Sequence, residues 1–157
     1  MNKELSIGFG TTCMHSGYEA EQHKSHLTPI YASSTYVFDS ADHAVDLFTG
    51  KQQGYIYGRF GNPTITQVEN KIAALETYSI SNADGTPLQA KAILHASGMG
   101  AISTLFLSTL KKGEKILTHL SLYGGTQELI DKVLPDCGLE TILINCKQLE
   151  LVEEAFK

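Results

Sequence analysis

Residues 91–119 read KAILHASGMGAISTLFLSTLKKGEKILTH, and this stretch decides the expected fold. The run Ala92-Ile93-Leu94 predicts a short buried strand, and Lys115 to His119 predicts a second one. Between them, residues 97–110 predict a helix whose core-facing residues are Ile102, Leu105, Phe106 and Leu110. A strand, a helix and a strand in this order predict a right-handed crossover between parallel strands.

The alternation continues toward the C-terminus. A predicted helix begins at Gly125 and stops near Pro135, residues 139–144 predict a third strand, and residues 149–156 begin one more helix. The expected fold class is therefore α/β with a parallel sheet, which needs cover on both faces. Because the chain ends within the last predicted helix, we expect this domain to be incomplete.

The N-terminal part has a different character. Residues 1–61 show little sustained periodicity and are rich in tyrosine, so we expect an extended arm laid over another surface, such as a second subunit. Within the arm, residues 41–48 predict one short helix. Asn62-Pro63 is typical of a helix start, and turn residues within 78–89 predict a surface loop or short hairpin. The expected organisation is an arm over 1–61 and the first part of a large α/β domain over 62–157.

Composition excludes several classes of function. The formal net charge is -5 without a basic run, so we expect no binding to nucleic acid. No apolar run is long enough to cross a bilayer, so we expect no membrane partner. The three cysteines, Cys13, Cys137 and Cys146, have irregular spacing that does not indicate a disulfide framework. A reducing cytoplasm is the simplest compartment for such a chain.

The segment Ala96-Ser97-Gly98-Met99-Gly100 follows the first predicted strand and opens a helix. Small residues let backbone N–H groups approach an anion, and the helix N-terminus adds partial positive charge. Because ligands of open parallel sheets lie beyond the carboxyl ends of the strands, a phosphate is the expected occupant. The alternative is that the glycines only permit close packing. A dinucleotide fits less well, because Ser103 replaces the third small residue of its fingerprint and the next strand ends without an acid.

Two further segments carry side chains that suit a phosphorylated, flat ligand. Tyr123 follows the next predicted strand, where its ring could stack on a heterocycle, although an ordinary loop tyrosine is the alternative. Arg59 is a fixed cation whose forked donors fit phosphate oxygens, and Tyr57 could donate one more hydrogen bond. The alternative for Arg59 is a surface arginine in a turn.

Together these segments resemble the pyridoxal-phosphate enzymes of cysteine and methionine metabolism, which include cystathionine γ-synthase, cystathionine γ-lyase, methionine γ-lyase and O-acetylhomoserine sulfhydrylase. The resemblance runs through nearly the whole chain and keeps the order of segments found in that family. The matching segments are 11–17, 28–36, 57–64, 97–102 and 123–126.

The resemblance implies a fold-type I, aminotransferase-like domain that binds pyridoxal 5'-phosphate. It implies that the segment Ser97-Gly98-Met99 binds the cofactor phosphate, with backbone N–H groups from its last two residues. Tyr57 and Arg59 would reach the same phosphate from the neighbouring subunit of a homodimer or homotetramer. Tyr123 would stack on the pyridine ring and assist proton transfer near the substrate, which makes it the candidate catalytic residue of this chain.

The implied activity is elimination or replacement at Cγ, or elimination at Cβ, of a sulfur amino acid or an O-acyl-homoserine. The Schiff-base lysine of the family, its pyridine-nitrogen aspartate and its carboxylate-binding arginine all lie further along than Lys157. We therefore expect an N-terminal fragment that is inactive alone. The alternatives are a non-catalytic truncated chain or an interaction module that pairs with full-length subunits, and a nucleotide-binding domain, which the missing ribose acid disfavours.

Two departures from the family pattern bear on this interpretation. Gly58 stands where relatives often have Ser or Thr, a difference that we expect to be tolerated. Gly125 stands where typical methionine γ-lyases carry a reactive cysteine, which favours a synthase, a sulfhydrylase or a cystathionine lyase.

Overall fold

The structure, a computed structural model, describes residues 7–18 and 24–156 and divides into two compact units. The first unit ends at Leu94 and the second begins at His95. The helix Pro63–Glu76 belongs to the first unit, whereas the boundary expected from the sequence, between residues 61 and 62, assigns it to the second domain. The domain boundary between residues 61 and 62 stays a prediction.

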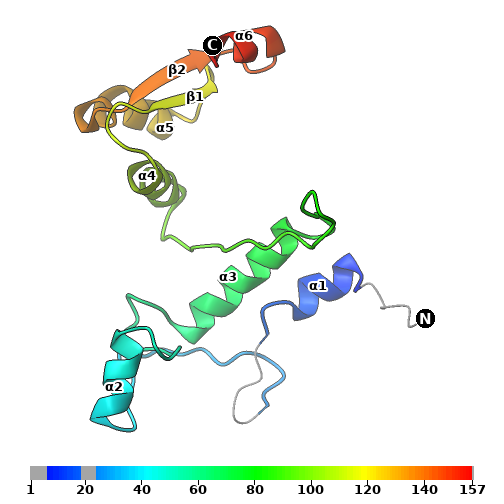
Figure 1. Cartoon of the computed structure of the whole chain (residues 1–157), viewed down its shortest axis with the longest axis vertical. Helices are drawn as coiled ribbons and strands as arrows, with labels where there is room; N and C mark the ends of the chain where they lie inside the picture. Colours follow the sequence, from blue (N-terminus) through cyan, green and yellow to red (C-terminus); the bar gives the residue numbers. More distant parts are fainter. Residues whose placement is uncertain (1–6, 19–23, 157) are drawn as a thin grey trace. The chain divides into compact units, whose positions relative to one another are not determined.

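The first unit holds helices α1 (Phe9–His15), α2 (Ala41–Phe48) and α3 (Pro63–Glu76), joined by extended segments (Figure 1). Helix α1 packs against α3. Among the described residues of this unit, Leu47 is the only buried apolar residue. The arm therefore closes no core of its own, as the irregular composition of residues 1–61 predicts.

Local signals explain where α2 and α3 begin. The Ser40 hydroxyl accepts a hydrogen bond from the His43 N–H, and the Asn62 side chain accepts one from the Thr64 N–H. Each contact satisfies a backbone donor that has no partner within the helix. Pro63 occupies the first turn of α3, where a missing N–H costs nothing. Both predicted helix starts are confirmed.

The turn-rich segment after α3 folds back on itself as a short hairpin. Ser81 and Pro87 form an antiparallel bridge, and Gly85 turns the chain with a φ of 81°. The Asp84 carboxylate accepts hydrogen bonds from the backbone N–H and the hydroxyl of Thr86. Both bonds lower the pKa of Asp84, the side-chain bond most, because they favour its charged form.

The second unit contains the regular alternation of helices and strands. Helix α4 (Gly98–Thr109) precedes β1 (Lys115–His119), and α5 (Gly124–Glu128), a π-turn (Leu129–Val133) and a 3-10 turn (Pro135–Cys137) lead to β2 (Glu140–Ile144) and α6 (Leu149–Ala155). Strands β1 and β2 lie side by side and parallel, with Lys115 opposite Glu140 and His119 opposite Ile144 (Figure 1). The predicted parallel pairing is confirmed.

The core of the second unit forms between the sheet and the helical segment after α5. Its buried members are Ile116, Leu129, Ile130, Leu134 and Leu139. Leu134 is fully buried at 0% exposure. Four partly buried residues near or on α4, together with one from the loop after β1, pack against this cluster: Met99, Ile102, Phe106, Leu110 and Leu122.

Two expectations from the sequence are wrong in this structure. Ala92-Ile93-Leu94 forms no strand, and Ile93 is 75% exposed. A strand needs a hydrogen-bonded neighbour, and the described sheet contains only β1 and β2, while the Leu94 N–H donates to the Glu69 carboxylate instead. Leu105 is also exposed, because the core-facing stripe of α4 follows Met99, Ile102 and Phe106.

Candidate functional site

The N-terminus of α4 presents free backbone donors. The Ser97 hydroxyl accepts a hydrogen bond from the Gly100 N–H at 3.0 Å, and the Ser97 carbonyl accepts one from Ala101 at 3.0 Å. No described residue accepts a hydrogen bond from the N–H groups of Gly98 or Met99. A Cβ built on Gly98 would meet nothing within 4 Å, so an anion has room to approach these two donors.

Tyr123 lies beside the same helix end. A Cβ placed on Gly125 would lie 2.9 Å from Cε1 of the Tyr123 ring and 3.3 Å from the Met99 sulfur. The ring and the thioether therefore both border the space above Gly125, and the Thr126 hydroxyl donates a hydrogen bond to the same sulfur at 3.7 Å. The Tyr123 ring is 76% exposed, so one face is open to a ligand.

The structure thus brings Met99, from the segment Ser97-Gly98-Met99 that begins α4, and Tyr123 to one corner of the second unit. The reason expected from the sequence does not hold, because residues 92–94 form no strand that could end beside β1. The two free N–H groups suit a phosphate, and the exposed ring suits a flat heterocycle. This set of donors fits pyridoxal phosphate. The individual roles of these residues in binding stay predictions.

Tyr57 and Arg59 are paired within the first unit. The Arg59 guanidinium carbon lies 5.2 Å from the centre of the Tyr57 ring and 5.7 Å from that of Phe60. Tyr57 forms an antiparallel bridge with Thr35, and the Gly58 N–H donates to the Ser34 carbonyl at 2.8 Å. These contacts hold the Arg59 side chain against two aromatic rings, on a segment that is tied to residues 34–35 of the arm. No carboxylate among the described residues forms an ion pair with Arg59.

Gly58 has space for a side chain. A Cβ there would contact the backbone of Ser34 at 3.4 Å, which is an ordinary van der Waals distance. A serine or threonine at this position would therefore fit, and the expectation that glycine is tolerated here stays a prediction.

The lysines near the second unit's sheet do not lie at this corner. Lys115 begins β1 at the end opposite Tyr123 and pairs with Glu140 at 3.0 Å. Lys112 contacts the position where a Cβ of Gly138 would be. Both lysines lie at the end of the two strands away from Tyr123, which agrees with their interpretation as surface residues.

One connection at the carboxyl edge of the sheet is not foreseen from the sequence. The Cys146 N–H donates to the His119 Nδ1 at 3.1 Å, which ties the loop after β2 to the end of β1. Parallel pairing brings the two residues together from positions 27 apart. The sequence signal is only that His119 ends one predicted strand and Cys146 closely follows another, and parallel strands end on one edge.

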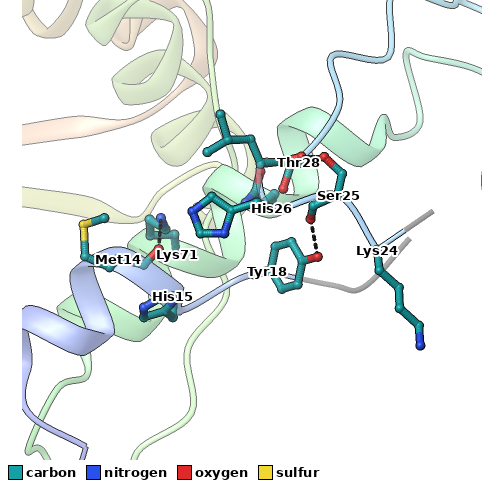
Figure 2. Close-up of a pocket in the computed structure, with 10 residues that line it drawn as sticks. Met14, His15, Tyr18, Lys24, Ser25, His26, Thr28 and Lys71 are labelled. Carbon is teal, nitrogen blue, oxygen red and sulfur yellow. Dashed lines mark hydrogen bonds between the residues drawn. The ribbon is translucent and has the colours of Figure 1, made fainter. Parts of the chain in front are cut away.

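A pocket of about 360 Å³ lies in the first unit, between α1, α3 and residues 24–28 (Figure 2). In it, Lys71 Nζ donates to the Met14 carbonyl at 3.2 Å, and the Tyr18 hydroxyl donates to the Ser25 carbonyl. Lys24 extends away from the other labelled side chains (Figure 2). None of the predicted cofactor-binding residues lines this pocket, so it is a separate feature.

Other classes of site receive no support from the described residues. Within 7–18 and 24–156, no group of three or more His, Cys, Asp or Glu side chains is arranged to hold a metal. Cys13, Cys137 and Cys146 are free thiols. In the same part of the chain, no helix combines the length and apolar character needed to cross a membrane.

Comparison with known proteins extends these observations. The family model for the Cys/Met metabolism PLP-dependent enzymes matches residues 10–157. An L-methionine gamma-lyase of Fusobacterium nucleatum subsp. nucleatum is 39% identical over 150 residues, which cover 96% of this chain and 35% of that protein.

Two solved structures share the fold. One, assigned as an O-acetylhomoserine (thiol)-lyase of Campylobacter jejuni, has a TM-score of 0.79 and 28% identity over 93% of this chain and 33% of its own, and it contains an N'-pyridoxyl-lysine-5'-monophosphate. A cystathionine gamma-lyase of Lactobacillus plantarum, complexed with L-serine, has a TM-score of 0.76 and 31% identity over 95% of this chain and 34% of its own. The α/β fold is thus part of a fold-type I domain.

The chain spans about a third of the length of these relatives. Its free helix N-terminus and adjoining exposed tyrosine fit the phosphate and the ring of pyridoxal phosphate, which is the cofactor that defines the matching family. The chain belongs to the family of pyridoxal-phosphate-dependent enzymes of cysteine and methionine metabolism.

Proposed function

We propose that the protein containing this chain uses pyridoxal phosphate to eliminate or replace a group at Cγ, or to eliminate one at Cβ, of a sulfur amino acid or an O-acyl-homoserine. The observation that carries the proposal is that the Tyr123 ring and the Met99 side chain both lie beside Gly125, near the two free N–H groups that begin α4. The family match supports the same cofactor.

Each residue at this corner has a task that its chemistry allows. The N–H groups of Gly98 and Met99 bind phosphate oxygens, and the Ser97 cap keeps the first turn of α4 in place. The Tyr123 ring covers one face of the pyridine, and its hydroxyl can move a proton beside the substrate. When bound, the cofactor supplies the electron sink for ionising the amino acid.

Tyr57 and Arg59 complete the phosphate site in this proposal. Their pairing in the first unit supplies a charged fork and a hydroxyl on one short segment. We propose that they act from the neighbouring subunit of a homodimer or homotetramer, in the cytoplasm. Support for a second subunit comes from the arm, whose apolar side chains are largely exposed among the described residues.

The choice between elimination and replacement rests on a single residue. Glycine at position 125 favours a synthase, a sulfhydrylase or a cystathionine lyase in our interpretation. The relatives named above include a methionine lyase, an O-acetylhomoserine thiol-lyase and a cystathionine lyase, so they do not separate these reactions.

The proposal is tested with the purified full-length protein and pyridoxal phosphate. L-methionine, L-homocysteine, L-cystathionine and O-acetyl-L-homoserine are supplied separately, and keto acid, ammonia and released thiol are measured. O-acetyl-L-homoserine is also supplied with sulfide, and new homocysteine is measured. We expect turnover of at least one of these substrates, and a protein that binds the cofactor but converts none would contradict the proposed activity.

A second candidate function is a non-catalytic chain that pairs with full-length subunits. It is favoured by one observation, which is that Lys115, the lysine of β1, lies at the strand end away from Tyr123 and pairs with Glu140. We expect the 157-residue chain, mixed with pyridoxal phosphate, to give no visible absorption band of lysine-bound cofactor and no turnover. A clear band accompanied by turnover would contradict this expectation.

A further inference from the structure

The pocket of the first unit depends on a close approach of the arm to α3 (Figure 2). Gly17 follows α1 with a φ of 75°, a conformation that favours glycine. A Cβ there would lie 2.5 Å from the Gln67 carbonyl oxygen and 2.8 Å from the backbone nitrogen of Lys71, so a larger residue would clash with α3. This approach brings His15 and Tyr18, which flank the glycine, to the same pocket as Lys71.

The polar side chains that line the pocket include a cation and several hydrogen-bond donors. Lys71 donates to the Met14 carbonyl at 3.2 Å, which leaves the other two N–H groups of its ammonium available. The rings of His15 and His26 also line the pocket, and no described residue forms a hydrogen bond with either ring. None of the described lining residues is an aspartate or a glutamate. The pocket therefore holds positive charge that no carboxylate of its own lining balances.

Thr28 adds a hydroxyl group that lacks a partner. Its oxygen is buried and forms no hydrogen bond with any described residue. Most buried polar side chains in folded proteins are hydrogen-bonded, because an unpaired one costs free energy. A hydroxyl can rotate to donate to an anion, so a ligand in this pocket would supply the missing partner.

The rest of the lining is partly apolar, with Met14, Leu27 and the ring of Tyr18 bordering the same space. The volume of about 360 Å³ is within the range of small-molecule sites. We propose that this pocket binds a small organic anion, whose carboxylate or phosphate group contacts Lys71 and Thr28 and whose apolar part lies against the apolar lining. The proposal is independent of the proposed function, because none of the predicted cofactor-binding residues lines the pocket.

Two lysines of this chain provide a matched pair of variants. Lys71→Gln removes the charge from the pocket, while glutamine can still donate to the Met14 carbonyl and keep α1 tied to α3. Lys24→Gln removes the same charge from a side chain that extends away from the other labelled side chains (Figure 2). Thr28→Val is a third variant, which removes the hydroxyl and keeps a side chain of similar size.

The experiment uses the full-length protein saturated with pyridoxal phosphate, so that the cofactor site is filled. Phenyl phosphate is titrated at constant ionic strength, and the carbon-13 methyl signal of Met14, assigned with Met14→Leu, reports binding at this pocket. Phenol supplies the same ring without the charge, and inorganic phosphate supplies the charge without the ring. The dissociation constant of each probe is measured in the wild type and in the three variants.

We expect phenyl phosphate to bind at least about threefold more tightly than inorganic phosphate, because its ring buries apolar surface, and phenol to bind more weakly than phenyl phosphate. Lys71→Gln should weaken phenyl phosphate binding by about 10-fold or more, through loss of a charge-assisted hydrogen bond. Thr28→Val should weaken it by about 3- to 10-fold, and Lys24→Gln by less than about twofold.

Several results would overturn the proposal. The first is a Met14 methyl signal that shows no saturable change with phenyl phosphate. Phenol that binds as tightly as phenyl phosphate would refute an anion site, and equal affinity for the two phosphates would refute an organic ligand. Equal effects of Lys71→Gln and Lys24→Gln would remove Lys71 from the site. If Lys71→Gln fails to fold, the comparison of Thr28→Val with Lys24→Gln decides, since an unchanged affinity in Thr28→Val would refute the assigned contact.

Discussion

At the scale of single residues, Tyr36 is unusual because its hydroxyl oxygen is buried and has no hydrogen-bond partner among the described residues. Its ring lies 5.5 Å from that of Tyr55. Burial raises the pKa of Tyr36, and the charges that Tyr55 and Tyr31 would carry when ionised raise it further. The folded protein therefore favours the neutral phenol.

This environment predicts the effect of removing one oxygen atom. Tyr36→Phe should leave the free energy of unfolding unchanged or raise it by about 1 kcal/mol, because no hydrogen bond is lost and a desolvation cost disappears. Urea denaturation of the full-length protein measures the change. Tyr78→Phe is the control, since the Tyr78 hydroxyl donates to the Ile7 carbonyl at 3.2 Å and its loss should not stabilise.

The same residue predicts a dependence on alkaline pH. With the folded pKa raised, the contribution of Tyr36 to stability is complete below the unfolded value of about 10 and is lost as pH rises toward the folded value. Tyr36→Phe should therefore lose less stability than the wild type between neutral pH and the alkaline range, as measured by urea denaturation at each pH. An equal loss of stability at alkaline pH in both proteins would contradict a raised pKa for Tyr36 in the folded protein.

At the scale of elements, Asn62 connects the start of α3 to the arm. Its side-chain oxygen accepts from the Thr64 N–H at 2.9 Å, and its amide donates to the Tyr31 carbonyl at 2.8 Å. The Thr64 hydroxyl in turn accepts from the Tyr31 N–H at 2.9 Å. One capping residue thus orders two segments that are 31 positions apart.

Two variants separate these contacts. Asn62→Ala should lower the free energy of unfolding by about 1–2 kcal/mol and speed proteolysis of the arm, because the cap and the tie to Tyr31 are both lost. Asn62→Asp keeps the capping oxygen and loses the donor, so it should cost less stability while still exposing the arm to protease. Equal proteolysis of Asn62→Asp and wild type would show that the Tyr31 contact is unimportant.

The π-turn after α5 is anchored by Leu134, whose N–H donates to the Leu129 carbonyl at 3.0 Å. Since Leu134 is fully buried, Leu134→Ala should lower the free energy of unfolding by about 2–5 kcal/mol through lost burial and a cavity. Leu107→Ala removes the same atoms from a residue that is 51% exposed and should cost under about 1 kcal/mol. Chemical denaturation of both variants tests the placement of the core.

At the scale of the whole molecule, our proposal that Arg59 acts from the neighbouring subunit predicts that two subunits complete each site. Arg59→Ala and Tyr123→Ala should each reduce activity, because each removes a group from the cofactor site. Coexpressed, they should restore about a quarter of the sites, since half of randomly formed dimers are mixed and one of the two sites in each is intact. The measurement is activity of the purified mixed oligomer.

A mixture no more active than its components would place Arg59 and Tyr123 in one subunit or remove Arg59 from the site. The control is a mixture of Tyr57→Phe with Arg59→Ala, both of which alter the same segment of one chain. Mixing that pair should give no intact site, and so no more activity than the average of the two separate variants. The reason is that each site in a mixed dimer still carries one altered phosphate-binding segment.

Much of the local structure could be predicted because its causes are local. The starts of α2 and α3 follow from Ser40, Asn62 and Pro63, and β1 has the predicted bounds, because capping contacts and apolar spacing lie within a few residues. The corner that joins Met99 to Tyr123 does not follow from strand order, because residues 92–94 form no strand; it depends on the contact between α4 and α5. The binding roles of these residues stay predictions.

What the sequence by itself determined was therefore the α/β class and most element bounds. Only the tertiary structure decided that Ala92 to Leu94 form no strand, that Leu105 faces outward, and that the Met99 side chain and the Tyr123 ring both lie beside Gly125. The physical reason is that strand pairing, burial and steric space depend on neighbours far along the chain, which no local pattern specifies.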